Sequence, residues 1–168
     1  MADGMRTVRI AHLFPELLNL YGDSGNILVL RSRLEWRHLG CEVREVHVGE
    51  RPSFSDVDLV FVGGGTDREQ RIVCESLLKE REELVSFVED GGVLSAVCGG
   101  YQLLGDYYLM GEERVQGLSL VDLHTDRGEP RLIGNVAVES RISPQPIVGY
   151  ENHGGRTHLG RGVEPLGA

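Results

Sequence analysis

The amino-acid sequence predicts an α/β protein built on a parallel β-sheet. Two observations carry this prediction. In the first half of the chain, short apolar runs rich in valine alternate with longer stretches of helical periodicity, in the order strand, helix, strand, strand, helix, strand, helix. Glycine clusters follow two of the apolar runs directly, at Gly63–Gly65 and Gly99–Gly100. Sites in parallel sheets form beyond the carboxyl ends of the strands, so both clusters fall where a site is expected.

The elements of this first half are expected in chain order. Cys41–Val48 alternates polar and apolar residues, so we expect it at an edge of the sheet with one face exposed. A helix is expected over Asn26–Leu39 with Gly40 as its C-terminal stop, and two helical pieces are expected over Asp67–Asp90. A short helix should begin just after Cys98. The expected strands are Val8–Phe14, Cys41–Val48, Val57–Val62 and Val93–Val97.

Two other regions give weaker signals. Tyr21–Asn26 (YGDSGN) is predicted to be a turn, with Asp23, Ser24 and Asn26 as candidate caps for the helix that follows. After Gly105 only short strands are expected, and the residues from Glu151 onward show almost no apolar periodicity. These strand candidates are Leu118–Leu123, Val136–Val138 and Ile147–Tyr150.

Length, charge and cysteine content limit the class of protein. A chain of 168 residues is long enough for one domain, expected over 1–168. The 26 acidic residues exceed the 17 basic ones and give a net charge of −9, which argues against nucleic acid or an anionic membrane surface as a partner. No apolar run is long enough for membrane insertion. Three cysteines without a CxxC spacing argue against a disulfide scaffold or structural zinc, so we expect a cytoplasmic protein.

Cys98 stands at a predicted corner between strand and helix. A strand, a sharp turn that carries a nucleophile and a helix make a nucleophile elbow, here with cysteine in place of serine. Such a turn strains the backbone, and close packing of the helix on the strand favours small neighbours such as Gly99 and Gly100. The helix N-terminus favours the reactive thiolate, and the Gly99 N–H is placed to hold an oxyanion. The alternative is a core cysteine at a strand end.

Gly63–Gly65 favours the catalytic interpretation. An elbow needs a second oxyanion donor from a neighbouring loop, and a glycine run lets backbone N–H groups approach a substrate closely. An ordinary turn between strand and helix is the alternative. A phosphate-binding loop is disfavoured, because the chain contains neither G-x-G-x-x-G nor G-x-x-x-x-G-K-[ST].

Four stretches together resemble one known family. VCGGYQLLG (Val97–Gly105) resembles the nucleophile segment of class I glutamine amidotransferases of the cobyric-acid-synthase-like branch. The stretches Leu18–Trp36, Gly63–Gln70 and Gly149–Gly160 narrow this resemblance to the GatD-type glutaminase subunits of lipid II isoglutaminyl synthase. The resemblance implies the flavodoxin-like parallel-sheet fold of class I glutamine amidotransferases.

The resemblance also implies a reaction and a partner. The glutaminase releases ammonia from its substrate glutamine, and a MurT-like Mur ligase subunit, bound to it as a heterodimer, amidates the D-glutamate of lipid II in peptidoglycan synthesis. No cofactor is implied. Carried over to this chain, Cys98 is the nucleophile that forms a glutamyl thioester, and Gly64 or Gly65 with Gly99 forms the oxyanion hole.

Two further residues are implied to bind glutamine. Gln102, one helical turn beyond the cysteine, is implied to face the substrate. Arg131, in PRLIGN, matches the glutamine-binding arginine of the family. A guanidinium holds an α-carboxylate with two parallel hydrogen bonds. From the residues alone, an arginine beside Pro130 is a solvated surface residue.

The catalytic histidine of the family has no counterpart in this sequence. The family carries it in a Y-L-H-G-P segment, which is absent here, so we expect a C-terminally incomplete chain with poor glutaminase activity alone. His153 and His158 follow the cysteine but lie in a different context, and no usual ligand spacing suggests a metal. The alternative is a catalytically impaired binding module that stabilises or regulates a Mur-ligase-like partner. The six histidines are His12, His38, His47, His124, His153 and His158.

Overall fold

The computed structural model describes residues 6–20 and 22–168. The chain forms two compact units, Met1–Leu104 and Gly105–Ala168, and each is described here by itself. The expectation of a single domain over 1–168 stays a prediction. Among the described residues, no helix combines the length and the apolar character needed to cross a bilayer.

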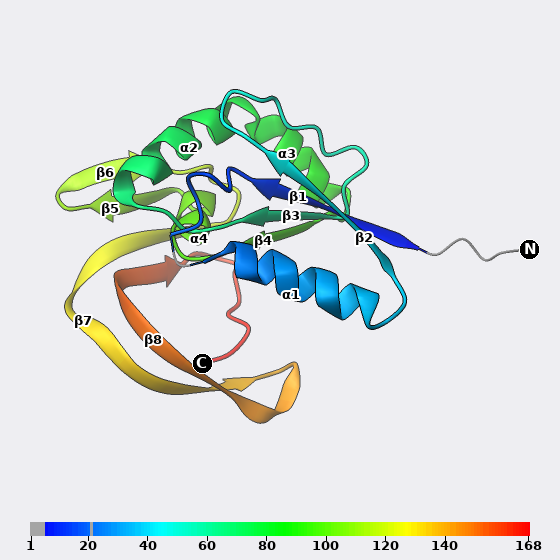
Figure 1. Ribbon diagram of the computed structural model, residues 1–168. Helices are drawn as coiled ribbons and strands as arrows, with labels where there is room; N and C mark the ends of the chain where they lie inside the picture. The colour runs from blue at the N-terminus through cyan, green and yellow to red at the C-terminus, as the bar shows by residue number, and fades with distance from the viewer. Residues whose placement is uncertain (1–5, 21) are drawn as a thin grey trace, which may run out of the picture. The chain divides into compact units, whose positions relative to one another are not determined.

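The first unit is built on a four-stranded parallel sheet in the order β2-β1-β3-β4 (Figure 1). This confirms the predicted parallel α/β class. The strand of alternating residues, β2, lies at an edge of the sheet, as its pattern predicted. The strands are β1 (Thr7–Leu13), β2 (Gly40–Val46), β3 (Leu59–Val62) and β4 (Val93–Ala96).

Helices cover both faces of this sheet, with α1 on one side and α2 and α3 on the other (Figure 1). Right-handed crossovers explain this, because the chain moves from β1 to β2 in one direction along the sheet and from β3 to β4 in the other. The expected two-piece helical segment is confirmed as α2 and α3. The helices are α1 (Ser24–Glu35), α2 (Asp67–Lys79), α3 (Arg81–Glu89) and α4 (Gly99–Leu104).

The core of the first unit lies between these layers. Ile10 of β1 and Phe61 of β3 pack against Ile27 of α1, and all three are buried. Leu77 of α2 and Leu84 of α3 are each 1% exposed. Burying a side chain of this size stabilises a fold by about 1.5–3 kcal/mol, so these periodic apolar positions hold the helices on the sheet.

The C-terminal end of α1 differs from the expectation. Gly40 is not the helix stop but the first residue of β2. The chain reverses at His38, which has a φ of 57°, and the Leu39 N–H donates to the Leu34 carbonyl at 3.0 Å. A Cβ on Gly40 would lie 2.5 Å from Thr7 Oγ1, so glycine is needed there for the close approach of β2 to β1.

The N-terminal end of α1 also differs. Tyr21, the first residue of the predicted turn, lies outside the described residues. Asp23 occupies the N-cap position but makes no side-chain capping bond, so its predicted role as a cap is wrong. The Ser24 N–H instead donates to Asn19 Oδ1, at 2.9 Å. Ser24 and Asn26 lie inside the helix.

The second unit is a four-stranded sheet in the order β6-β5-β7-β8. β7 and β8 form a long antiparallel hairpin, β5 pairs antiparallel with β6, and β5 pairs parallel with β7. The strands are β5 (Tyr107–Met110), β6 (Glu113–Gln116), β7 (Leu123–Ser140) and β8 (Ser143–Leu159).

Sequence patterns predicted this unit poorly. Val136–Val138 and Ile147–Tyr150 do lie in strands, but the strands are several times longer. The predicted strand Leu118–Leu123 is wrong, because residues 117–122 connect β6 to β7. β5 and β6 were not predicted.

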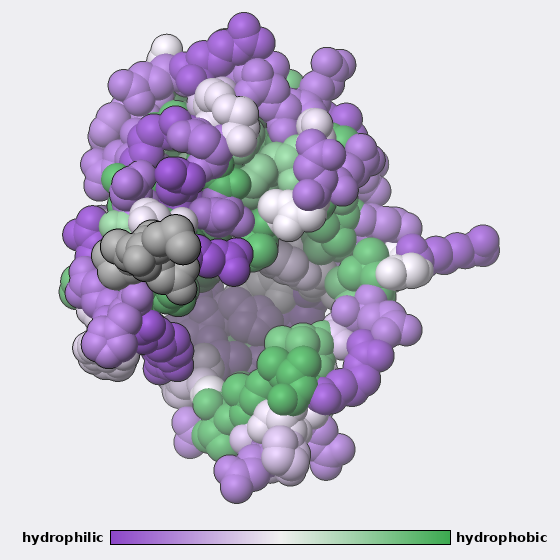
Figure 2. Space-filling view, turned by 90° about the vertical axis from the view of Figure 1, so that its right-hand side faces the viewer, coloured by the Kyte–Doolittle hydropathy of each residue, from purple (hydrophilic) through white to green (hydrophobic). Residues whose placement is uncertain are grey.

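Exposure of apolar side chains on the hairpin explains this result. Ile133, Val148 and Tyr150 are 60%, 77% and 65% exposed. Figure 2 shows hydrophobic residues, in green, at the surface of the hairpin. Because the two strands are held by backbone pairing more than by a buried face, they lack the regular alternation that identifies a half-buried strand.

Candidate functional site

Cys98 lies at a corner between β4 and α4. It is exposed and has a φ of 53°, in the left-handed region that a residue with a side chain rarely adopts. The Val97 N–H still donates to the Val62 carbonyl, at 3.0 Å, so sheet pairing continues up to the corner. The Gln102 N–H donates to the Cys98 carbonyl at 3.2 Å, so the helix begins at once. The predicted strained turn between strand and helix is confirmed.

Glycines at this corner leave room for closely packed backbone. The Gly100 N–H donates to the Gly63 carbonyl at 3.1 Å, which joins the corner to the end of β3. A Cβ on Gly100 would lie 2.6 Å from that carbonyl oxygen and 2.8 Å from the Val62 carbonyl oxygen. A Cβ on Gly64 would lie 2.9 Å from Cys98 Cβ and 3.3 Å from its Sγ. The two glycine clusters therefore lie against each other and against the cysteine.

The backbone of the glycine run is oriented by hydrogen bonds. The Gly64 carbonyl accepts from the Leu20 N–H at 3.1 Å, and the Gly65 carbonyl accepts from Gln70 Nε2 at 3.0 Å. Within residues 6–20 and 22–168, the N–H groups of Gly64, Gly65 and Gly99 donate no hydrogen bond. These three buried glycines thus keep backbone donors unpaired beside the cysteine corner, and backbone N–H is the donor type that an oxyanion needs.

Gln70 supports this arrangement, and sequence reasoning missed it. Its side chain is 4% exposed, donates to the Gly65 carbonyl and occupies the space where a Cβ on Gly99 would stand. It therefore bridges the glycine run and the cysteine corner. Its Oε1 is buried without a hydrogen-bond partner in the described part of the chain. The available signal was a glutamine on the apolar stripe of α2, in line with the buried Val73 and Leu77.

α2 itself begins with a capping box. The Thr66 N–H donates to Glu69 Oε2 at 2.8 Å, and the Glu69 N–H donates back to Thr66 Oγ1 at 3.5 Å. The bond from the Thr66 backbone, together with its hydroxyl, holds the pKa of Glu69 below its ordinary value. This cap fixes the first turn of α2 and with it the position of Gln70.

The two residues implied to bind glutamine lie in different units. Gln102, half-buried on α4, is one turn from Cys98. Arg131 lies on β7 of the second unit and is exposed. Asn152 of β8 holds its guanidinium, with Nε donating to Oδ1 at 2.7 Å and Nη2 donating to the carbonyl at 2.9 Å.

The histidines after the cysteine also lie in the second unit. Both ring nitrogens of His153 have partners, with Nδ1 at 2.9 Å from the Gly155 carbonyl oxygen and Nε2 at 3.1 Å from Glu151 Oε2. This ring is therefore hydrogen-bonded to its neighbours within β8. His158 pairs instead with Asp126, across the hairpin.

The other two cysteines differ from Cys98 in their surroundings. Cys74 of α2 is 3% exposed, and burial, with a smaller contribution from Glu75, raises the pKa of its thiol. Cys41 is half-buried on β2. Among the three cysteines, Cys98 is the one exposed at a loop beyond the carboxyl ends of the strands.

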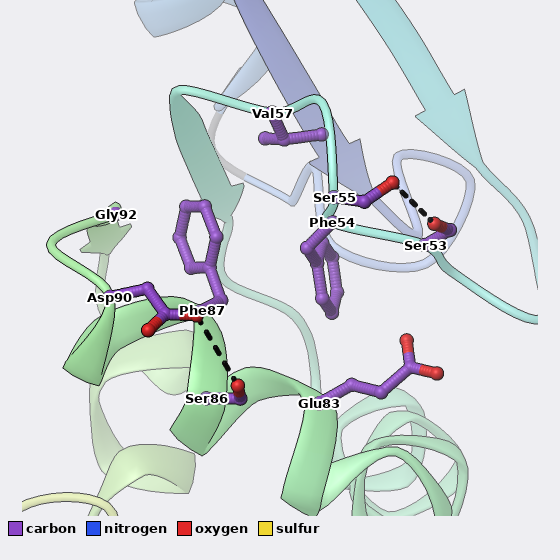
Figure 3. Close-up of a pocket in the computed structure, with 9 residues that line it drawn as sticks. All are labelled: Ser53, Phe54, Ser55, Val57, Glu83, Ser86, Phe87, Asp90 and Gly92. Carbon is purple, nitrogen blue, oxygen red and sulfur yellow. Dashed lines mark hydrogen bonds between the residues drawn. The ribbon is translucent and has the colours of Figure 1, made fainter.

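A separate hollow of about 480 Å³ opens at the other end of the same sheet (Figure 3). Phe54 and Phe87 line it with ring centroids 5.6 Å apart, and Ser86 Oγ donates to Asp90 Oδ2 at 3.5 Å. It lies beside the segments that precede β3 and β4, whereas Cys98 follows β4. This hollow therefore does not adjoin Cys98.

Comparison with known proteins gives the class of protein. The CobB/CobQ-like glutamine amidotransferase domain matches residues 9–168, and the chain belongs to this family. A solved structure described as a glutamine amidotransferase has the same fold, with a TM-score of 0.59 over 94% of this chain and 78% of its own, at 18% identity. The family resemblance and the fold class predicted from the sequence are confirmed.

Within this family, the chain is similar over most of its length to proteins of one kind, the GatD subunits. The chain is 39% identical to the lipid II isoglutaminyl synthase (glutamine-hydrolyzing) subunit GatD of Staphylococcus aureus strain N315, over 92% of this chain and 63% of the relative. It is 37% identical to the subunit of the same name in Streptococcus pneumoniae strain R6, over 95% of this chain and 62% of the relative. A cobyric acid synthase of Brucella canis is 37% identical over 45% of this chain and 17% of its own length. The chain thus spans less than two thirds of the GatD relatives.

Proposed function

We propose that this chain is the glutaminase subunit of a lipid II isoglutaminyl synthase. Cys98 attacks glutamine, and the released ammonia passes to a MurT-like Mur ligase partner that amidates the D-glutamate of lipid II. One observation carries the proposal. A strained, exposed cysteine lies against Gly64 beside three backbone N–H groups that no described residue occupies. Membership of the amidotransferase family and similarity to two GatD subunits support it.

The chemistry follows from the corner. The Cys98 sulfur attacks the side-chain carboxamide carbon of glutamine, and the carbonyl oxygen becomes negatively charged. The N–H of Gly99, with that of Gly64 or Gly65, stabilises this oxyanion, and one such donor is worth about 3 kcal/mol of transition-state stabilisation. Ammonia leaves with a proton and a glutamyl thioester remains. Water then hydrolyses the thioester to glutamate and restores the thiol.

Substrate binding is assigned to Gln102 and Arg131. Gln102 contacts the bound glutamine from the first turn after the nucleophile. Arg131 takes the α-carboxylate with the N–H groups that Asn152 does not occupy. Because Asn152 fixes the guanidinium plane in advance, less conformational freedom is lost when the carboxylate binds.

We also propose that the chain forms a heterodimer with the ligase and acts in the cytoplasm. The two GatD relatives carry the word subunit in their names, which supports a partner chain. Ammonia that reaches a ligase directly is not lost to solvent, so the partner is expected to contact the chain near Cys98. The low cysteine content and the absence of a CxxC spacing are compatible with a cytoplasmic setting.

Labelling with 6-diazo-5-oxo-norleucine, a glutamine analogue that alkylates nucleophilic cysteines, tests the proposal. We expect one adduct per chain by intact-mass measurement, located on Cys98, with none in the Cys98→Ala variant. Cys74→Ala is the matched control, because the buried thiol of Cys74 should not react and its loss should leave labelling unchanged. Labelling that persists in Cys98→Ala would refute the assignment of the nucleophile.

A second candidate is a binding module without catalysis. It is favoured by the surroundings of His153, because both ring nitrogens of this residue already have partners. It predicts no labelling of Cys98 but a stable complex with a Mur-ligase-like protein by size-exclusion chromatography. Labelling of Cys98 would exclude it in favour of the glutaminase.

A further inference from the structure

Two histidines and one aspartate converge on the hairpin of the second unit. His124 and Asp126 lie two residues apart on β7 and therefore on the same face, and His158 of β8 is the register partner of His124. His124 Nε2 lies 3.9 Å and His158 Nε2 lies 3.4 Å from Asp126 Oδ2. One ligand atom from each residue lies within 4.8 Å of the other two. We call these three residues the His–Asp–His cluster.

The register that builds this cluster is well fixed. Thr125 of β7 and Thr157 of β8 are direct partners, and their hydroxyl oxygens are 3.2 Å apart. Because neighbouring positions of a strand face opposite sides, both threonines point away from the cluster; Thr125 is buried and Thr157 is exposed. A slip of one residue would move His158 to the other face, so the Thr125–Thr157 pair holds the cluster together.

The rings of the cluster are ordered by stacking. The His124 ring stacks on the His158 ring at 4.8 Å and on the Tyr107 ring of β5 at 4.9 Å, with interplanar angles of 17° and 16°. The Arg114 guanidinium of β6 lies 3.7 Å from the Tyr107 ring centroid. This column crosses all four strands of the second unit. The stack holds the His124 ring between Tyr107 and His158, and the His158 ring must turn out of the stack for both imidazoles to bind one ion.

The Asp126 carboxylate faces the two histidines, because the arginine opposite it bonds elsewhere. Its register partner is Arg156, but the Arg156 guanidinium donates to the Pro130 carbonyl at 2.6 Å and to the Gly155 carbonyl at 3.1 Å. The Asp126 carboxylate therefore faces the two imidazoles, His124 and His158. The side chains of His124, Asp126 and His158 are 35%, 38% and 53% exposed, so solvent ions can reach all three.

We propose that the His–Asp–His cluster binds a divalent transition-metal ion, with Zn²⁺ as its principal ligand. Two imidazole nitrogens and one carboxylate oxygen are donors that suit Zn²⁺ and Co²⁺. Tetrahedral coordination at about 2.0 Å places ligand atoms roughly 3.3 Å apart, so the three atoms need to close by only about 1.5 Å. Side chains at this exposure can make that rotation. One position stays open to water.

None of the three residues of this site is among those assigned to the proposed glutaminase activity, so the site can be tested separately from it. The histidine spacing in the sequence suggested no metal, since His153 and His158 have no accompanying ligand nearby in the chain. The structure pairs His158 with His124 instead, a residue far away in the sequence.

Isothermal titration of the untagged chain with ZnCl₂ tests the site. The Cys98→Ser background is used, because an exposed thiol also binds zinc. We expect one equivalent of Zn²⁺ to bind, and Asp126→Asn or His158→Gln to weaken binding by about tenfold or more. His153→Gln is the matched control on the same strand and should bind as the parent does. Co²⁺ should give a ligand-field spectrum of low coordination number in the parent and in His153→Gln, but not in Asp126→Asn or His158→Gln.

A melting measurement separates loss of binding from loss of folding. Zn²⁺ should raise the Tm of the parent and of His153→Gln, whereas His158→Gln should melt at the same temperature with or without the ion. Failure of the parent to bind a stoichiometric ion would overturn the proposal. So would equal zinc affinity in the parent, Asp126→Asn and His158→Gln.

Discussion

The cysteine corner of the first unit and the long hairpin of the second unit are built on different principles. At the corner, a Cβ on Gly100 would collide with two backbone carbonyl oxygens, and a Cβ on Gly99 would collide with the Gln70 side chain. On the hairpin, a Cβ on Gly134 would meet nothing within 4 Å. The corner is thus determined by backbone packing around buried strands. The hairpin is held by cross-strand partners on an exposed surface, and its backbone at Gly134 has room for a side chain.

The largest difference is expected from alanine at Gly100. A Cβ there would lie 2.6 Å and 2.8 Å from two backbone carbonyl oxygens, which cannot rotate away. We expect Gly100→Ala to lower the free energy of unfolding by about 3 kcal/mol, measured by chemical denaturation. Gly134→Ala, the matched control on the hairpin, should change it by less than about 0.5 kcal/mol. Equal effects at the two positions would remove the contrast between the regions.

Gly64→Ala should impair the reactivity of the cysteine more than the stability of the fold. The added methyl would lie 2.9 Å from Cys98 Cβ and 3.5 Å from the Gly99 nitrogen, so it displaces the nucleophile relative to the oxyanion donors. We expect the rate of labelling by the diazo-ketone to fall about tenfold, which corresponds to about 1.4 kcal/mol in the barrier. Gly25→Ala, where the methyl meets nothing within 4 Å, should label at the parent rate.

The same contrast explains what the sequence could predict. Buried parallel strands such as β3 are short apolar runs that end in glycine, so the order of elements and the corner at Cys98 could be predicted from local pattern. The side-by-side arrangement of Gly64 and Cys98 was expected as well, because neighbouring parallel strands end at the same edge. Gly40 was misinterpreted because a glycine needed between two strands looks like a helix stop when only its sequence neighbours are considered.

Other features depended on contacts that no local pattern contains. The role of Gln70 depends on a carbonyl of the preceding loop and on the space left by Gly99. The pairing of His124 with His158 depends on hairpin register, and the exposed hairpin shows no regular apolar alternation from which register could be inferred. The assignment of Arg131 depended on family resemblance, and its role stays a prediction.

Gln70 is expected to stabilise the corner by a smaller amount. Gln70→Met keeps the volume of the side chain but leaves the Gly65 carbonyl without its donor. We expect a loss of about 1 kcal/mol in the free energy of unfolding and slower labelling of Cys98. Asn152→Ala, which removes a side-chain acceptor from the exposed Arg131, is the control on the hairpin and should cost less. If Gln70→Met leaves labelling unchanged, Gln70 does not position the corner.

The smallest expected effect is on pH dependence. His12 of β1 is 1% exposed, and burial lowers the pKa of its ring, although Glu45, Asp23 and Glu16 oppose this. Because the unfolded ring takes up a proton near its ordinary pKa of 6.5 and the folded ring resists it, stability is full above that pH and falls as pH drops below it. His12→Gln should flatten the dependence of unfolding free energy on pH between neutral and mildly acidic buffer.

A matched substitution tests whether that pH effect comes from the core. His38→Asn replaces an exposed histidine of the first unit with a residue that tolerates its φ of 57°. This variant should keep the acid-dependent loss of stability of the parent. A parent whose stability does not fall on acidification, or a His12→Gln variant that loses as much as the parent, would contradict the assignment to His12.

The most direct measurement of the central claim is a crystal structure of the chain after reaction with 6-diazo-5-oxo-norleucine. The account predicts a covalent bond to Cys98 Sγ, with the ketone oxygen of the adduct about 2.7–3.1 Å from the Gly99 nitrogen and from the nitrogen of Gly64 or Gly65. An adduct on another residue, or one on Cys98 whose ketone oxygen faces solvent away from both glycine clusters, would contradict it.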